Sequence, residues 1–537
     1  MTHRRLAIVA LLAVVLAGCR GHAPEPAPSV AGRAEAPWWK GAVFYEVFVR
    51  SFADGNGDGV GDLNGLISKL DYLNDGKAET KDDLGVDALW LMPVFESPSY
   101  HGYDTVDYET IERDYGTNAD FARLLAEAHR RGIRVIVDLM LNHTSIEHPW
   151  FIESAQGPSS PRRDWYVWSK TNPGWGQPWN PTGQTWHKLG DEWYYGLFWS
   201  GMPDLNFRTP AVRAEMTRIA TKWVEAGVDG FRLDAVRHLV ETGPGPGQEG
   251  SEENHVYLRE LARAVHAARP QAAMVGEVWS TTGEIAKYFG RGDELEMLFD
   301  FPLAGALVKS AWSGDAQPVL DALAEMKRSY PVGACSAPFL TNHDQVRVAT
   351  ALGRDSQRLR LAAALLLTMP GSPFLYYGEE LGMPNGPGSE DEWKRTPMQW
   401  GEGAGLGFTT GTAWHATAPT QLVAPVARQQ GDRASLLARY RSLIAARKSS
   451  VALSRGDIEP LSAPSSVLAF LRTEGDERVL VAHNLSGARV VADFTVGGES
   501  AVPLFADPNA RIERMGPSWR AQLGPYESGM FRLSGLR

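Results

Sequence analysis

Eight short apolar runs, rich in β-branched residues, recur along most of the chain. The segments between them place apolar residues at helical spacing, and several of these segments end at Gly, as a helix often does. Strands that are apolar on both faces and alternate with helices are typical of parallel sheets. The pattern therefore predicts an α/β protein built on a (β/α)₈ TIM barrel. The expected strands cover 42–49, 86–94, 133–141, 228–236, 272–279, 296–303, 337–344 and 373–380.

One connection is too long for an ordinary barrel loop. Between the third and fourth expected strands, residues 146–201 carry no strong helical period and hold eight tryptophans. Because long loops without structure of their own are uncommon in compact domains, we expect a small inserted domain over 144–204. The catalytic barrel then consists of two parts, 37–143 and 205–450.

The C-terminal part has a different pattern. After a last expected helix at 433–450, short alternating runs are separated by Gly, Pro and Asp. Such runs predict an antiparallel β-sandwich over 451–537. Its clearest candidate strands cover 467–472, 478–485, 489–496 and 529–533.

The N-terminus has the pattern of an export signal over 1–18: a short basic start, an apolar run too short to span a bilayer, and small residues before Cys19. Leu16-Ala17-Gly18-Cys19 resembles a bacterial lipobox, which implies cleavage before Cys19 and lipid attachment to its sulfur; a plain signal peptide is the alternative. Residues 19–36 lack large apolar side chains, which predicts a tether. We expect an exported protein anchored in the cell envelope, on the outer face of the cytoplasmic membrane or on the outer membrane.

Charge and cysteine content restrict the partners. The net charge is −11, and no basic run follows the N-terminus, which argues against nucleic acid as a ligand. If Cys19 carries lipid, Cys335 is the only other cysteine, so we expect it to be a core residue without a disulfide. We expect a monomer.

Polar residues gather where the expected strands end. Reacting groups of TIM barrels lie at the C-terminal ends of the strands. A single polar residue at a strand end could simply cap the following helix or form hydrogen bonds that stabilise the fold. Carboxylates on three separate strand ends are more typical of a functional site. The residues are Asp138, Asn142 and His143 after the third strand, Arg232 and Asp234 on the fourth, Glu277 on the fifth, and His343 and Asp344 on the seventh.

These residues lie in motifs that resemble those of the α-amylase family of glycoside hydrolases, which are retaining enzymes built on a (β/α)₈ barrel. The motifs occur in the family's order along the chain. They are DLMLNH (138–143), MPDLN (202–206), GFRLDAVRH (230–238), GEVW (276–279) and FLTNHD (339–344).

The resemblance implies a role for each carboxylate. Asp234 is the expected nucleophile, Glu277 the general acid and then base, and Asp344 the carboxylate that grips sugar hydroxyls. Retaining chemistry needs two carboxyl groups about 5–5.5 Å apart. Arg232 should favour the ionised form of Asp234, while neighbouring carboxylates should raise the pKa of Glu277. A purely structural ion pair is the alternative interpretation of Arg232 and Asp234.

The resemblance also implies side chains that bind substrate. Tyr103 is expected to stack on the sugar at the cleaved bond, and His143 and His343 to donate hydrogen bonds to it. Arg347 matches a further site residue of the family. Arg237 and His238 are expected on the leaving-group side, although a pair on a helix surface would have the same pattern.

The glycine-rich segment 54–62 spaces oxygen ligands as a calcium loop does. It is not a complete EF-hand, because Gly65 stands where the bidentate Glu would be. Loops of this kind follow the first strand in several bacterial members of the family, so we expect a structural Ca²⁺; a solvated turn is the alternative. The expected ligands are Asp54, Asn56, Asp58, the Val60 carbonyl and Asp62.

The motifs indicate the type of bond better than the length of the substrate. The tryptophan-rich insert favours an extended cleft, and with it an endo-acting enzyme that cleaves α-1,4 bonds in starch, maltodextrins and related α-glucans. TPMQW (396–400) instead resembles oligo-1,6-glucosidases. The whole pattern resembles bacterial lipoprotein α-amylases intermediate between the oligo-1,6-glucosidase and neopullulanase groups. Alternatives are an exo-acting α-glucosidase, a neopullulanase-like or cyclomaltodextrinase-like enzyme, and a non-catalytic glucan-binding lipoprotein.

Overall fold

The computed structural model describes residues 36–77 and 79–535, so the expected signal segment, Cys19 and almost all of the expected tether lie outside the described residues. The described residues from Trp38 onward form one compact unit. Within that part of the chain, no helix has the length and apolar character needed to cross a bilayer.

Eight parallel strands form the central sheet, in the order β12-β11-β10-β9-β5-β2-β1-β13. Backbone hydrogen bonds from Ser372 to Ser336 and from Phe374 to Pro338, both 2.9 Å, join the two ends of the sheet and close the barrel. The predicted TIM barrel is therefore confirmed. The strands are β1 (Phe44–Val47), β2 (Ala88–Leu91), β5 (Arg134–Met140), β9 (Gly230–Asp234), β10 (Ala273–Gly276), β11 (Met297–Phe299), β12 (Cys335–Ala337) and β13 (Phe374–Tyr376).

The seventh predicted strand, 337–344, was wrong in position, because β12 ends at Ala337. Pro338 follows it and has no backbone N–H to donate to a sheet ladder. The residues after Pro338 form the loop that carries His343 and Asp344. Cys335 is a buried free thiol, as expected of a core residue.

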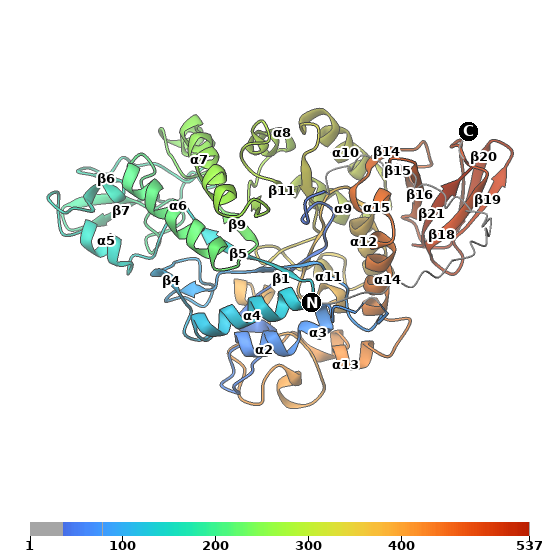
Figure 1. Ribbon diagram of the computed structural model, residues 1–537, viewed down its shortest axis with the longest axis horizontal. Coiled ribbons are helices and arrows are strands. Elements are labelled where there is room, and N and C mark those ends of the chain that lie inside the picture. The colour runs from blue at the N-terminus through green and yellow to red at the C-terminus, as the bar shows by residue number, and fades with distance from the viewer. Residues whose placement is uncertain (1–35, 78, 536–537) are drawn as a thin grey trace, which may run out of the picture. The chain divides into compact units, whose positions relative to one another are not determined.

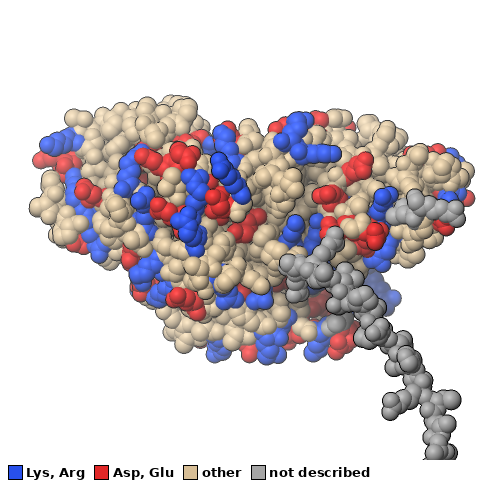
Figure 2. All heavy atoms as spheres, turned by 45° about the horizontal axis from the view of Figure 1, so that its top comes forward, with Lys and Arg blue, Asp and Glu red and all other residues tan. Residues whose placement is uncertain are grey.

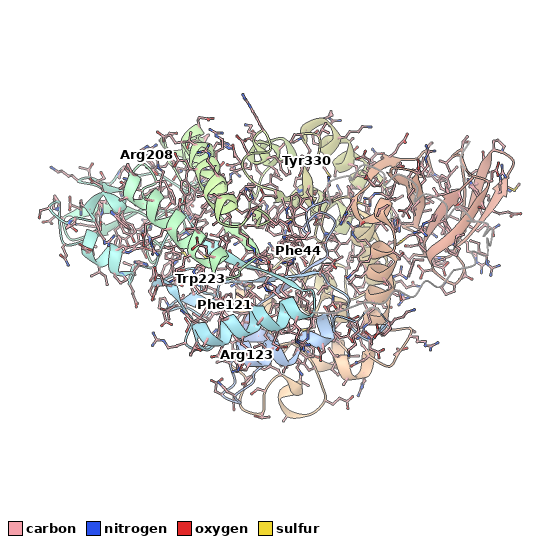
Figure 3. All side chains as sticks on the ribbon, viewed as in Figure 1. Phe44, Phe121, Arg123, Arg208, Trp223 and Tyr330 are labelled. Carbon is pink, nitrogen blue, oxygen red and sulfur yellow. The ribbon has the colours of Figure 1, made fainter. Side chains whose placement is uncertain are left out.

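Helices surround the barrel, as Figure 1 shows for α4, α6 and α7 around β5 and β9. Thr117 caps α4 through a capping box with Asp120. The rings of Phe121 in α4 and Trp223 in α6 meet edge to face at 5.5 Å and join the two helices (Figure 3). The longer helices are α4 (Asn118–Arg130), α6 (Pro210–Glu225), α7 (Glu252–Ala268), α9 (Phe301–Ser313), α10 (Gln317–Ser329), α12 (Ser356–Thr368) and α14 (Leu436–Lys448). The short helices are α1 (Val49–Phe52), α2 (Leu63–Ser68), α3 (Leu70–Leu73), α8 (Thr282–Ala286), α11 (Val348–Ala351), α13 (Val426–Gln429) and α15 (Val451–Arg455).

The connection after β5 folds as a small unit of its own, with a three-stranded sheet in the order β6-β8-β7. Most of its tryptophans pack within this unit: the ring of Trp168 stacks on Phe151, and Trp186 is 5% exposed. Trp179 and Trp199 are about half exposed, at 53% and 51%. The elements are α5 (Pro149–Ser154), β6 (Trp168–Ser169), β7 (Trp186–Leu189) and β8 (Glu192–Tyr195), and the hairpin β3 (Phe95–Glu96) and β4 (Asp107–Ile111) precedes them.

The C-terminal strands form two antiparallel sheets, in the orders β14-β15-β16-β21-β18 and β17-β20-β19. Leu480 and Leu533 of the first sheet share one buried cluster with Phe494 and Trp519 of the second, so the two sheets form a sandwich. On the molecular face shown in Figure 2, acidic and basic side chains are interspersed. The strands are β14 (Asp457–Pro460), β15 (Val467–Glu474), β16 (Glu477–Asn484), β17 (Val490–Phe494), β18 (Ser500–Ala506), β19 (Arg511–Met515), β20 (Ser518–Leu523) and β21 (Ser528–Ser534).

Candidate active site

Side chains that point into the barrel change character along the strands. Successive residues of a strand face opposite sides, so alternate residues share the interior. Phe44, Ile136, Val275 and Phe374 belong to a buried apolar cluster in that interior. Toward the C-terminal ends of the strands, the interior positions are instead polar. The polar residues therefore lie directly above the apolar cluster, at the end of the barrel where TIM-barrel active sites are found.

Arg232 is the centre of that polar layer. Its Nη1 donates to Asp138 at 2.8 Å and to Asp234 at 2.6 Å, and its Nη2 lies 2.9 Å from Glu277. The guanidinium is 1% exposed and lies over the rings of Trp90 and Tyr103. One buried cation thus holds carboxyl groups from β5, β9 and the end of β10 together.

Glu277 has the environment of a general acid. The pKa of its carboxyl group is raised to about 7: burial is the main cause, Arg232 opposes the shift, and the charges of Asp234 and Asp344 add to it. The backbone N–H of Ala235 donates to Oε2 of Glu277 at 3.2 Å. Ala235 has a φ of 48°, an uncommon left-handed conformation for a residue with a Cβ, directly after Asp234. At a pH below about 7, Glu277 therefore carries a proton.

Asp344 has the opposite environment. Burial would raise the pKa of its carboxyl group, but the charges of His343 and Arg395 outweigh it and hold the pKa below its usual value. Nη2 of Arg395 lies 3.0 Å from Oδ1 of Asp344, and Nε2 of His343 lies 3.2 Å from Oδ2. Because the charge of Asp344 acts on the pKa of Glu277, Asp344 belongs to the same electrostatic cluster as the three carboxyl groups on Arg232. The three carboxylates predicted to act together are thus close to one another.

The aromatic and histidine side chains line this cluster. The hydroxyl of Tyr103 donates to Asp138 at 3.1 Å, and its ring stacks on that of His343. His343 is fixed by Glu46 at Nδ1 and by Tyr103 at Nε2, both at 2.6 Å. Nε2 of His143 is buried and has no hydrogen-bond partner among the described residues, so it is free to meet a ligand hydroxyl. Burial lowers the pKa of His143, which favours the neutral ring.

Arg237 and His238 lie just beyond β9. Nη1 of Arg237 donates to the carbonyl of Trp279 at 2.6 Å, and Nδ1 of His238 lies 3.0 Å from the carbonyl of Gln248. The half-exposed ring of Trp179, from the inserted unit, meets the ring of His238 edge to face. These residues therefore join the inserted unit to the segment that follows Asp234.

Arg347 and Arg395 are both buried beside the loop that carries Asp344, but their contacts differ. Arg347 donates to the carbonyls of Lys394 and Tyr377, at 2.6 and 2.7 Å. In this arrangement it supports the loop around Asp344. The arginine that contacts Asp344 directly is Arg395, from the segment before TPMQW, and the sequence interpretation did not include it as a site residue. Its contact spans 51 residues of chain, which no local motif spacing reveals.

The loop 54–62 lies apart from these carboxylates. Oδ1 of Asp54 accepts from Asn56 and Gly57 N–H groups, and Asp62 accepts from Gly55 and Gly65. Over 36–77 and 79–535, no group of three or more His, Cys, Asp and Glu side chains is arranged to hold a metal ion. The loop offers the oxygen ligands that Ca²⁺ prefers, but in this arrangement its carboxylates accept hydrogen bonds from backbone N–H groups of the same loop and of Gly65. The predicted Ca²⁺ therefore stays a prediction.

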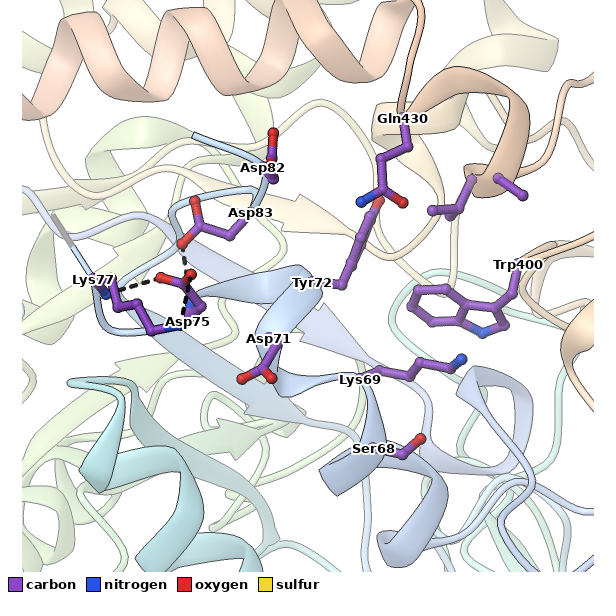
Figure 4. A pocket seen from close by; sticks show the side chains of 12 residues that line it. Ser68, Lys69, Asp71, Tyr72, Asp75, Lys77, Asp82, Asp83, Trp400 and Gln430 are labelled. Atoms are coloured by element: carbon purple, nitrogen blue, oxygen red, sulfur yellow. Dashed lines mark hydrogen bonds and ion pairs between the residues drawn. The ribbon is translucent and has the colours of Figure 1, made fainter. Parts of the chain in front are cut away.

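A separate pocket of about 420 Å³ is lined by residues of α3 and α13 and by the side chains of Asp75, Lys77, Asp82 and Asp83 (Figure 4). It contains none of the predicted site residues. Its main aromatic ring, Trp400, is 7% exposed, and the ammonium of Lys69 lies 4.7 Å from the ring centre. Because Trp400 has little open surface, this pocket offers no flat aromatic platform.

Comparisons with known proteins agree with this geometry. The family described as "Alpha amylase, catalytic domain" matches residues 46–456, and "Maltogenic Amylase, C-terminal domain" matches 459–529. The chain is 39% identical to "Alpha-amylase 3" of Dictyoglomus thermophilum, over 93% of this chain and 94% of that protein. It is 32% identical to the "Oligo-1,6-glucosidase" of Bacillus cereus, over 93% of this chain and all of that protein.

Among solved structures, an alpha-amylase from H. orenii superposes with a TM-score of 0.83 at 38% identity, covering 92% of this chain and 99% of that one. The barrel, the carboxylates gathered on Arg232 and these matches lead to one conclusion: the chain belongs to the alpha-amylase family of glycoside hydrolases.

Proposed function

We propose that the protein is a retaining, endo-acting glycoside hydrolase that cleaves α-1,4-glucosidic bonds in starch, maltodextrins and related α-glucans. The observation that carries the proposal is the pairing of Asp234 and Glu277 on two nitrogens of one guanidinium. This arrangement brings the two carboxyl groups close together, as the double-displacement mechanism requires. The raised pKa of Glu277 supports its role as the acid.

In the first step, Glu277 transfers its proton to the glycosidic oxygen while the bond from that oxygen to the anomeric carbon breaks. The carboxylate of Asp234 forms a new bond to the anomeric carbon, which gives a covalent glycosyl–aspartate. In the second step, the Glu277 carboxylate accepts a proton from water, and the water oxygen displaces Asp234 from the anomeric carbon. Two inversions leave the product with the α configuration.

Other side chains would bind and orient the sugar. The ionised carboxylate of Asp344 can accept hydrogen bonds from ring hydroxyls, and the unpartnered Nε2 of His143 can donate one. The open ring faces of Trp179 and Trp199 on the inserted unit fit the flat faces of further glucose units, which favours a long substrate.

An exo-acting α-glucosidase is the alternative, and one observation favours it. The segment that includes Arg395 packs against Asp344, and Lys394 donates to the Asp344 backbone carbonyl at 3.0 Å. Such packing would narrow the cleft on that side and favour chain ends. The Bacillus cereus relative is named "Oligo-1,6-glucosidase".

Two measurements on amylose test the proposal: the loss of viscosity separates endo from exo action, and the anomer of the product tests retention. The proposal predicts a fast loss of viscosity before much glucose forms, and NMR detection of α-anomers among the first products. Early glucose release at constant viscosity would support the exo-acting alternative. β-Anomers would contradict the retaining mechanism, and binding of amylose without any cleavage would support a glucan-binding protein instead.

We also propose a structural Ca²⁺ at the loop 54–62. Calcium that binds only the folded chain stabilises it, and the gain in free energy grows with the logarithm of the calcium concentration once that exceeds the dissociation constant. Added Ca²⁺ should therefore raise the melting temperature of chelator-treated protein, and Asp58→Asn should reduce that rise. Equal melting temperatures with Ca²⁺ and with chelator would contradict this site.

Lipid attachment at Cys19 and location in the cell envelope are proposed from the sequence alone. A lipidated form should partition into the detergent phase of Triton X-114, and Cys19→Ser should move the protein to the aqueous phase. Partition of both forms into the aqueous phase would instead support a plain signal peptide.

A further inference from the structure

A groove of about 480 Å³ lies next to the candidate active site and contains none of its proposed side chains. One wall is a single face of α9, since residues three and four apart on a helix are neighbours. The other wall is the loop after β12, which also carries Asp344. The lining residues are Gly305, Val308, Lys309 and Trp312 of α9 together with Leu340, Thr341, Gln345, Val346 and Ala351.

Trp312 is the main aromatic group of this groove. Its side chain is 53% exposed, which is unusual for so large an apolar surface. The guanidinium of Arg358 lies 4.4 Å from the ring centre and so covers one face of the indole. The ring is thereby held in place while about half of its surface remains open.

Polar groups accompany this ring. Lys309 lies one helical turn before Trp312 and supplies an ammonium group. Gln345 lines the groove directly after Asp344, and its amide oxygen has no hydrogen-bond partner in the described part of the chain. This oxygen is buried and therefore lacks both a protein donor and open water, so a ligand hydroxyl that reached it would satisfy it.

We propose that this groove is a second binding site for an α-glucan strand, continuous with the loop that carries Asp344. An open indole face suits the C–H face of a glucose ring, and the amide and ammonium groups suit its hydroxyls. Val346, which lines the groove and is 45% exposed, adds apolar contact area. The inference rests on the proposed function only for the identity of the ligand.

Adsorption to starch granules tests the groove without hydrolysis. All proteins in this assay carry Asp234→Asn, so that the granules stay intact. Trp312→Ala should weaken adsorption about tenfold, as expected when an aromatic side chain that the bound glucan would cover is removed. Gly305→Gln should weaken it as well, because an added Cβ at Gly305 meets no atom within 4 Å and the side chain would extend into the groove. Gln430→Ala, in the pocket of Figure 4, is the matched control and should adsorb like its parent.

Hydrolysis of 4-nitrophenyl α-maltotrioside, with Asp234 restored, separates this inference from the proposed function. Trp312→Ala and Gly305→Gln should both retain kcat/KM within about twofold on this short substrate, because the groove is outside the reacting site. Absence of hydrolysis by the parent would refute the proposed function. Unchanged adsorption of both variants, loss in Trp312→Ala alone, or a parent that does not adsorb to starch would each overturn the groove as a glucan site.

Discussion

Buried arginines occur in two regions of this molecule, and their partners differ. In the barrel, Arg232 contacts three carboxyl groups. At the junction between the barrel and the C-terminal sheets, Arg472 and Arg447 are fully buried, and both guanidinium groups donate to backbone carbonyls. Burial lowers the pKa of Arg447 to about 10, and it also lowers the pKa of Arg472. In contrast, the surrounding acids raise the pKa of Arg232 despite its burial.

This difference distinguishes a reactive site from a site that only stabilises the fold. The carbonyls of Leu367, Thr368 and Met369 lie at the end of α12, where unpaired C=O groups carry partial negative charge. Arg447 and Arg472 satisfy these groups and tie α12 to the segments around it. Around Arg232, in contrast, carboxyl groups outnumber the cation, and burial together with these neighbouring carboxyl groups keeps Glu277 protonated near neutral pH. The two regions should therefore respond differently to substitution.

Asp234→Asn should have the largest effect. Loss of the nucleophile is expected to lower kcat/KM for maltoheptaose by at least about 10⁴-fold. Circular dichroism and urea unfolding should show a folded protein, because the amide keeps the shape of the carboxylate. A decrease below tenfold would contradict the role of Asp234.

Glu277→Gln should lower kcat/KM for unactivated glucans by about 10³-fold, within the range of general acid catalysis. The loss should be much smaller with a fluoride leaving group, which departs without a proton. Measured rates with maltotriose and α-maltosyl fluoride check this difference. Equal losses on both substrates would assign Glu277 a role other than proton transfer.

Arg472→Met should affect stability and spare activity. It leaves buried carbonyls without donors, and we expect a decrease of about 3 kcal/mol in the free energy of unfolding, measured in urea. Arg520→Met is the matched control: its ion pair with Asp493 is exposed and should contribute far less to the free energy of unfolding. In contrast, Arg232→Met should lower kcat/KM by about 10²-fold or more. If Arg472→Met lowered kcat/KM as much as Arg232→Met does, the distinction between the two regions would fail.

The pH profile should show the smallest effect. The pKa of Glu277 is raised to about 7, so the acid is protonated below that pH and loses its proton above it. The kcat/KM for maltoheptaose should therefore fall as the pH rises through about 7, and Glu277→Gln should lack this decrease. A profile of the parent that stays flat to pH 9 would contradict the assignment of the acid.

Much of the barrel could be predicted because its strands are continuous apolar runs, a strong local signal. The position of β12 could not, since 337–344 is apolar enough for a strand although Pro338 ends the ladder after Ala337. In the site, Arg232 and Asp234 could be predicted because both lie on one strand face. Arg395 was missed because its contact with Asp344 forms only when distant loops pack together.

The junction was the least predictable region. Arg472 stands at the end of an alternating apolar run, where sequence alone indicates an exposed strand end. The structure places it at 0% exposure, bound to carbonyls of α12 and of the segment before β15. The identity of such carbonyl partners depends on tertiary packing and leaves no residue pattern in the sequence.

The most direct test is to trap the glycosyl–enzyme. Glu277→Gln incubated with 5-fluoro-α-maltosyl fluoride should form the covalent intermediate readily and release it slowly, because no general base remains to activate water. Peptide mass spectrometry should then find the fluorosugar attached to Asp234. Attachment to another carboxylate, or turnover of the reagent with no labelled peptide at any time, would contradict a mechanism in which Asp234 attacks and Glu277 transfers protons.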